Sequence, residues 1–470
     1  MPYTEHTRGS GVGEVRTTGA KNNGGYYDST ISGAGYDYSQ QDAAQVSFTD
    51  LTTPSAGSTM LASVDGTWPQ DCVGNAMNIT AGTNFDIGAD STSVYWITAV
   101  AVDGKSVTLD RTPTGAGAGS VGVGRLGGAR ISVGGAMANA ASGQKVYVKG
   151  GTYTVGSGTV NTSGNAFKPP AGSATYGTTT IIGYSTTRGD MALTSPVVHT
   201  YHVAGTFCDV SNGGVSVYFI QVEGGSTASS VGFFTGLHSQ VVGCVAQAMA
   251  TGFRGSNGQF VCCLADGCTN GFGDGTSAII YCSRCWAKGC TGGYGFYVAS
   301  AAVIDSCVAS GGSTNGFFSN TSASFLNCTA YGNAASGFIR ANTTLTRATA
   351  YTNCLSVSNT GYGFEDQSSQ VMTLVTCASY GNSTARSTGV SALRDMGGLA
   401  LAGDPFVAAT SNDFRLNDRG AGLVARTGGT YNTWPGYSTL LQNQMVGAIP
   451  TLAVTPYAPW PTHSGWPNGG

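Results

Sequence analysis

Apolar residues recur through the middle of the chain in a fixed phase, at intervals of about 21–23 residues. In seven successive repeats one position is cysteine, and the residue two places later is alanine or serine. The residue three places before each cysteine is apolar, and a Gly-Phe pair follows the cysteine in six repeats. The cysteines are Cys244, Cys263, Cys285, Cys307, Cys328, Cys354 and Cys377, and the phenylalanines are Phe253, Phe272, Phe296, Phe317, Phe338 and Phe364.

This pattern predicts a solenoid of short β-strands. Alternate residues of a strand point to opposite faces, so each cysteine shares a face with the alanine or serine that follows it. The repeat is too short for a strand–helix–strand crossover, but it fits one coil of short strands. Stacked coils would pile equivalent side chains into internal columns, because no coil can bury its inner face alone. We interpret the periodic cysteines as small, reduced core residues.

A further column follows the cysteines by five residues. Asparagine tolerates left-handed turn geometry, and its amide can bond the turns above and below. We therefore predict an outer turn column. Its members are Cys268, Cys290, Gly312, Asn333, Asn359 and Asn382.

The Cys-x-Ala-x-x-Asn coils with their Gly-Phe pairs resemble the pectate-lyase-like superfamily of right-handed parallel β-helices. Residues 404–406, 412–416 and 447–449 resemble the closing segment that follows many such helices. The resemblance covers about residues 140–450 and implies an all-β fold, a right-handed parallel β-helix. It is specific for the fold and says little about function.

The rest of the chain divides by composition. Residues 94–102 and 106–110 predict two strands joined by an Asp103-Gly104 hairpin turn, and 115–128 predicts a glycine-rich link. Residues 145–153 and 178–184 fit the first coils of the helix. We predict four regions: an extended N-terminal arm at 1–45, which we expect a neighbouring subunit to anchor, a small β domain at 46–130, the β-helix at 140–405, and a C-terminal capping segment and tail at 406–470.

The composition of the chain argues against nucleic acid and membrane as partners. The chain is 41% hydrophobic, 10% charged and has a net charge of −3, so it should fold. It has no basic patch for nucleic acid, and its apolar runs are too short for a membrane span. Residues 1–15 show no charged-then-apolar leader, so we expect no secretory signal.

The sequence contains no motif that indicates a catalytic site. Polysaccharide lyases and hydrolases of the resembled fold use clustered carboxylates, and neither the hydrolase motifs nor a run of calcium-binding aspartates occurs here. We assign no catalytic residue, no metal and no cofactor. Six residues just after the Gly-Phe column are candidates to line one lateral face and hold a glycan, with solvated surface residues as the alternative: Arg254, Asp274, Tyr297, Arg340, Glu365 and Asp366.

Some histidines and cysteines are weaker candidates for metal binding or redox chemistry. His199 and His202 lack an obvious third metal ligand, so we interpret them as a loop pair. Cys268 and Cys290 occupy equivalent positions in adjacent coils, which leaves open reduced packing, a disulfide or a zinc site with Cys263 and Cys285. We favour reduced packing. The spacing of Cys282 and Cys285 resembles a redox pair, but no thioredoxin-like pattern surrounds it.

The order of arm, small β domain and helix is similar to that of β-helical spikes and fibres of tailed phages. We predict a virion structural protein: a phage spike, fibre or capsid-surface component that forms a homotrimer, docks on other particle proteins through residues 1–130 and contacts host glycans. The alternatives are a polysaccharide lyase or glycoside hydrolase of β-helix fold, and a cell-surface adhesin or filament subunit. These alternatives would place the protein outside the cell or at its surface. We favour a non-catalytic role.

Overall fold

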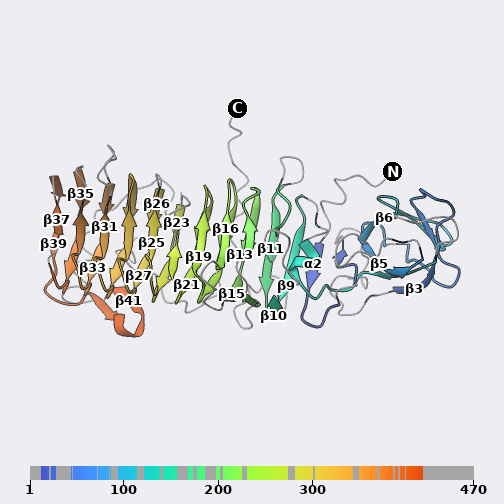
Figure 1. Ribbon diagram of the computed structural model, residues 1–470, viewed down its shortest axis with the longest axis horizontal. Coiled ribbons are helices and arrows are strands. Elements are labelled where there is room, and N and C mark those ends of the chain that lie inside the picture. Colours follow the sequence, from blue (N-terminus) through green and yellow to red (C-terminus); the bar gives the residue numbers. More distant parts are fainter. Residues whose placement is uncertain are drawn as a thin grey trace, which may run out of the picture.

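The computed structural model describes residues 12–20, 23–27, 44, 46–70, 72–83, 85, 94–113, 121–137, 140, 142–155, 168–172, 177–185, 197–201, 205–224, 230–273, 281–299, 302–341, 349–367, 371–384, 387–389, 392–396 and 398–416. A right-handed parallel β-helix extends as a rod from a small β domain at one end (Figure 1). The predicted all-β fold is confirmed, since helix in the described residues is confined to α2 (Val133–Met137) and the short 3-10 helix η2 (Ala409–Ser411). Over these ranges no helix is long and apolar enough to cross a membrane.

Most coils of the helix contribute one strand to each of three sheets, and strands of neighbouring coils pair in parallel. The first sheet has the order β2 (Tyr26–Tyr27), β1 (Val12–Val15), β9 (Lys145–Lys149), β11 (Thr179–Tyr184), β14 (Val215–Tyr218), β17 (Gln240–Val242), β20 (Gln259–Val261), β23 (Tyr281–Ser283), β26 (Ala302–Asp305), β29 (Ala323–Leu326), β32 (Thr349–Thr352), β35 (Val371–Val375) and β38 (Ala392–Met396). The second sheet contains β10 (Gly151–Val155), β12 (Val197–Tyr201), β15 (Ile220–Gly224), β18 (Val245–Gln247), β21 (Leu264–Asp266), β24 (Trp286–Lys288), β27 (Val308–Ser310), β30 (Thr329–Tyr331), β33 (Leu355–Val357), β36 (Ala378–Tyr380) and β39 (Leu399–Ala400). The third sheet contains β13 (Gly205–Val210), β16 (Ser230–Thr235), β19 (Thr251–Gly255), β22 (Asn270–Phe272), β25 (Phe296–Val298), β28 (Phe317–Ser319), β31 (Phe338–Arg340), β34 (Phe364–Asp366) and β37 (Ser387–Gly389).

Columns of equivalent side chains fill the interior, as the repeat predicts. The repeat cysteines are buried, and backbone hydrogen bonds join consecutive ones, as from the Val308 N–H to the Cys285 carbonyl (2.9 Å). From Phe253 to Phe364 the repeat phenylalanines form a continuous stack, with ring centroids 4.6–5.0 Å apart and planes within 9° of parallel. The predicted stacked columns are therefore confirmed, and both kinds of residue belong to one core.

The predicted outer turn column lies inside the helix, which corrects the sequence interpretation. Asn333 and Asn359 are buried, and their amides bond neighbouring coils as expected. Asn333 Nδ2 donates to Asn359 Oδ1 (2.9 Å), and Asn359 Nδ2 donates to Asn382 Oδ1 (3.0 Å). The left-handed residue is the one before each asparagine, as at Gly332 (φ 61°) and Ser358 (φ 54°). That residue makes the corner, so the following amide points inward.

The small β domain is a six-stranded sheet in the order β3 (Val46–Leu51), β8 (Gly122–Leu126), β5 (Ala76–Gly82), β6 (Val94–Val100), β7 (Ser106–Leu109) and β4 (Met60–Ala62). The predicted hairpin is confirmed, since β6 and β7 pair antiparallel and Gly104 turns with φ 66°. The predicted glycine-rich link is wrong over β8, which pairs with β3 and β5. A Cβ at Gly124 would overlap Met77 Cε and lie 2.5 Å from Leu51 Cδ1, so glycine there permits close packing rather than flexibility.

Part of the predicted arm is a strand of the β-helix itself. β1 pairs in parallel with β9, from Val12 opposite Lys145 to Val15 opposite Val148, and β2 pairs antiparallel with β1. These residues are therefore anchored by their own chain and need no neighbouring subunit to hold them.

The segment after the last coil folds back along the side of the helix (orange in Figure 1). Its strands β40 (Phe406–Ala408) and β41 (Asp413–Leu416) pair with each other. Phe406 and Phe414 pack edge-on against Tyr331, with ring centroids 5.9 and 5.4 Å away, and Phe414 also packs against Trp286. This segment therefore covers outward side chains of the second sheet. Residues 447–449 lie outside the described ranges.

Candidate functional site

Strand alternation in the third sheet decides where the predicted site residues lie. Each repeat phenylalanine is buried, so the next residue points outward and the one after it points inward. Arg254, Tyr297 and Glu365 hold the outward position and are partly exposed. Arg340 and Asp366 hold the inward position and are only 2% and 1% exposed. The prediction that these two line a lateral face is therefore wrong.

Arg340 and Asp366 instead form a polar region inside the helix. They are Cα partners on β31 and β34, and the buried Ser319 is the partner of Arg340 on β28. Tyr351 lies close to them: burial raises the pKa of its phenol well above the usual value, and the charges of Arg340 and Asp366 act on it with opposite sign. All four side chains are buried, so this region is part of the core. Asp274, the remaining predicted residue, lies outside the described ranges.

The outer face of the third sheet carries a cluster of aromatic rings, which we call the aromatic platform: Tyr294, Tyr297 and Phe318. The rings of Phe318 and Tyr297 stack with centroids 4.9 Å apart, and the ring of Tyr294 lies 4.2 Å from that of Phe318. All three side chains are partly exposed. Asn320 Nδ2 donates to the Tyr297 hydroxyl (2.9 Å) and fixes its position. Exposed apolar surface of this kind, edged by polar groups, is typical of a binding site.

Two residues of the platform, Tyr294 and Phe318, were missed by the sequence analysis. The signal for Phe318 was present, because it directly follows the core residue Phe317 and so takes the outward position. Tyr294 precedes the strand, and its approach to the other rings depends on the turn, which no repeat predicts.

Charged side chains stand at the two ends of the platform. Glu365, on β34, lies two strands beyond it and accepts hydrogen bonds from Ser336 Oγ and Gln367 Nε2, both 2.5 Å. Arg254, on β19, lies two strands before it, and its guanidinium sits over the Phe234 ring, 5.0 Å from the centroid. Phe234 belongs to β16, so this contact draws the cation away from the platform.

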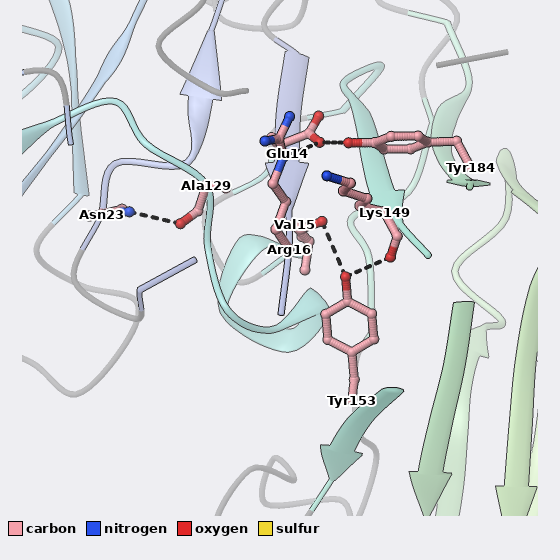
Figure 2. A network of polar contacts seen from close by, with 8 residues as sticks. All are labelled: Glu14, Val15, Arg16, Asn23, Ala129, Lys149, Tyr153 and Tyr184. Carbon is pink, nitrogen blue, oxygen red and sulfur yellow. Dashed lines mark hydrogen bonds and ion pairs between the residues drawn. The ribbon is translucent and has the colours of Figure 1, made fainter. Parts of the chain in front are cut away.

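A second polar cluster lies where β1 joins the helix (Figure 2). The carboxylate of Glu14 is fully buried, forms an ion pair with Arg16 (3.1 Å) and accepts a hydrogen bond from the Tyr184 hydroxyl. The Tyr153 hydroxyl donates to the Lys149 carbonyl (2.7 Å), and burial raises its pKa. Because the Glu14 carboxylate is enclosed, this cluster fastens the first strand to the helix, and the carboxylate itself is out of reach of a substrate.

His199 is a core residue and not a metal ligand. Its ring is 2% exposed, stacks on Tyr153 at 4.9 Å and packs against Phe207 at the same distance. Burial lowers its pKa to about 3. Within the part of the chain that the structure describes, no group of three His, Cys, Asp or Glu residues is arranged to hold a metal. His202 lies outside that part.

The buried imidazole predicts acid sensitivity. Unfolded His199 has a pKa near 6.5, so the unfolded state binds the extra proton as the pH falls from 6.5 towards 3. The contribution of His199 to stability is complete above pH 6.5, and about 2 kcal/mol of it should be lost at pH 5. We expect His199→Phe to flatten the dependence of the denaturant midpoint on pH between 7 and 5. His238→Asn, at an exposed turn with φ 57°, is the control and should leave that dependence unchanged. An equally steep profile for His199→Phe would contradict the assignment.

All thirteen cysteines are free thiols, which excludes the Cys268–Cys290 disulfide from this structure. Both residues are buried, and burial raises the pKa of Cys268 to about 12. The thiols donate to backbone carbonyls, as from Cys263 Sγ to the Val241 carbonyl (3.2 Å). Reduced packing, the favoured interpretation, is therefore what the structure contains.

The chain matches no protein-family model and no curated protein. Among solved structures it is similar to pectate lyase Pel9A, with a TM-score of 0.50 and 18% identity over 68% of this chain and 91% of the lyase. A rhamnogalacturonan lyase gives a TM-score of 0.39 at 14% identity, over 54% of this chain and 70% of that one. The catalytic domain of a GH87 alpha-1,3-glucanase in complex with nigerose gives 0.30 at 10%, over 76% and 90%. The likeness to Pel9A identifies the fold class, the pectate-lyase-like β-helix, and does not by itself identify an activity.

Proposed function

We propose that this β-helix binds a polysaccharide on the aromatic platform. The observation that carries the proposal is the contact of three partly exposed rings on the outer face of the third sheet, with one hydroxyl held by Asn320. Such rings cover the C–H face of a sugar, while nearby hydroxyl and amide groups bond its hydroxyls. The name of the pectate lyase that shares the fold also supports a polysaccharide ligand.

The virion role stays a prediction, as do the homotrimer, docking through residues 1–130, and the adhesin or filament alternative. Neither the described residues nor the comparisons support them, and the similarity to a pectate lyase favours the lyase or hydrolase alternative over the virion role. Contact with a glycan is common to several of these possibilities, so the platform can be tested without deciding among them.

Binding to a panel of immobilised polysaccharides tests the proposal. We expect Tyr297→Ala and Phe318→Ala each to weaken the affinity about tenfold, because one aromatic contact of about 1.4 kcal/mol is lost. Gln259→Ala, at an exposed position of the first sheet, is the control and should bind as the unaltered chain does. The proposal fails if no polysaccharide binds, or if a variant that combines Tyr297→Ala with Phe318→Ala binds normally.

Cleavage of the bound chain is a second candidate function, favoured by the position of Glu365. Its carboxylate is partly exposed at one end of the platform and is held by Ser336 and Gln367, as an acid–base group would need to be. If Glu365 takes part in cleavage, Glu365→Gln should abolish product formation in reducing-end and unsaturated-product assays while binding persists. Equal product from both forms would remove Glu365 from this role.

A further inference from the structure

We infer that the polysaccharide bound on the platform is a neutral one, without carboxylate or sulfate groups. This inference rests on the proposed function and adds the chemical class of the ligand. It follows from the side chains that surround the rings and from the direction of the two flanking charges.

Among the residues that the structure describes, the polar groups beside the platform are uncharged. Asn320 donates to the Tyr297 hydroxyl. Asn315 is partly exposed and holds, in the next coil, the position that Tyr294 holds in its own coil. The Asn315 Oδ1 accepts a hydrogen bond from the Ser336 N–H (2.8 Å). Amide and phenol groups both donate and accept, which suits the hydroxyls of a neutral sugar. A carboxylate placed against these groups would lose water without gaining an ion pair from them, and burying an unpaired charge is costly.

The two flanking charges that the structure describes, Glu365 and Arg254, do not supply that partner. Equivalent outward positions on four successive strands are held by Tyr297, Phe318, Ile339 and Glu365. The first charged side chain in this series beyond the platform is therefore the carboxylate of Glu365. Glu365 lies about 10 Å from Phe318, two strand spacings away, and would repel an anionic chain. In the other direction, Arg254 lies at a similar separation and is turned over the Phe234 ring.

The step from the platform to Glu365 also carries no charge. Between Phe318 and Glu365 the equivalent outward position is held by Ile339, which is 5% exposed and so adds little surface of its own. A chain lying across the strands would therefore rest on the rings of Tyr297 and Phe318 and meet no charge on the next strand. Such a surface selects for shape and C–H area rather than for charge.

The test compares affinities for neutral hexose polymers and for one uronic acid polymer in its free-acid and its fully methyl-esterified forms. The ester keeps the backbone and removes the charge. We expect the neutral polymers and the ester to bind at least tenfold more tightly than the free acid, and we expect salt from about 0.05 to 0.5 M to leave their affinity unchanged. Glu365→Gln should raise the affinity for the free acid and leave that for the ester unaltered.

Two other results have distinct meanings. Tighter binding of the free acid, weakened by salt, would overturn the neutral class and leave polysaccharide binding intact. Binding of none of these polymers, with Tyr297→Ala and Phe318→Ala behaving as the unaltered chain, would overturn the proposed function and this inference with it.

Discussion

Replacing Arg340 by methionine is expected to lower the free energy of unfolding by about 3–5 kcal/mol. Arg340 and Asp366 are both buried and are Cα partners on neighbouring strands. Methionine has a similar length but no charge, so it would remove the buried cation from the strand next to the buried Asp366 carboxylate. Denaturant unfolding, followed by circular dichroism, measures the loss.

Two further variants separate charge from packing. Arg340→Met combined with Asp366→Leu should recover most of the stability, because both buried charges are then removed together. Arg254→Met, at an outward position of the same sheet, should change stability by less than about 1 kcal/mol. If the double variant is as unstable as the sum of the two single ones, the two residues are not compensating charges.

The repeat was sufficient to predict the coils, because each column must match from one coil to the next. Any residue that faces the interior is constrained by its equivalents above and below, and this constraint appears in the sequence as periodic Cys307, Cys328 and Cys354. The same periodicity could have separated Arg340 and Asp366 from the outward residues, had the alternation been counted from Phe338 and Phe364. Their charge suggested a surface, and the strand geometry overrides that expectation.

Other features leave no periodic trace. β1 pairs with β9 across more than a hundred residues, and its four residues carry no repeat. The glycines of β8 are needed for close packing against Met77 and Leu51, yet glycine-rich sequence alone equally suggests a linker. The inward direction of Asn333 and Asn359 depends on which of two adjacent residues adopts positive φ, and both glycine and asparagine can do so.

Replacing Phe317 by alanine is expected to cost about 3–5 kcal/mol of stability. Its ring is fully buried between Phe296 and Phe338, with centroids 4.8 and 4.7 Å away, and packs edge-on against Phe325 at 5.8 Å. The neighbouring coils are fixed by their backbone ladders, so they cannot move inward to fill the cavity. Unfolding in denaturant should show a lower midpoint, and a leucine at this position should restore part of the loss.

The adjacent Phe318→Ala supplies the matched control, since it removes an identical ring from the opposite face of the same strand. We expect it to change stability by about 1 kcal/mol or less, because the ring is partly exposed, and to weaken polysaccharide binding about tenfold. Phe317→Ala, measured below its unfolding transition, should bind normally. Phe317 would then be assigned to the stability of the core, and Phe318 to binding at the surface. Similar losses of stability from both variants would mean that the Phe318 ring is packed as a core residue, and the platform could not then be an exposed binding surface.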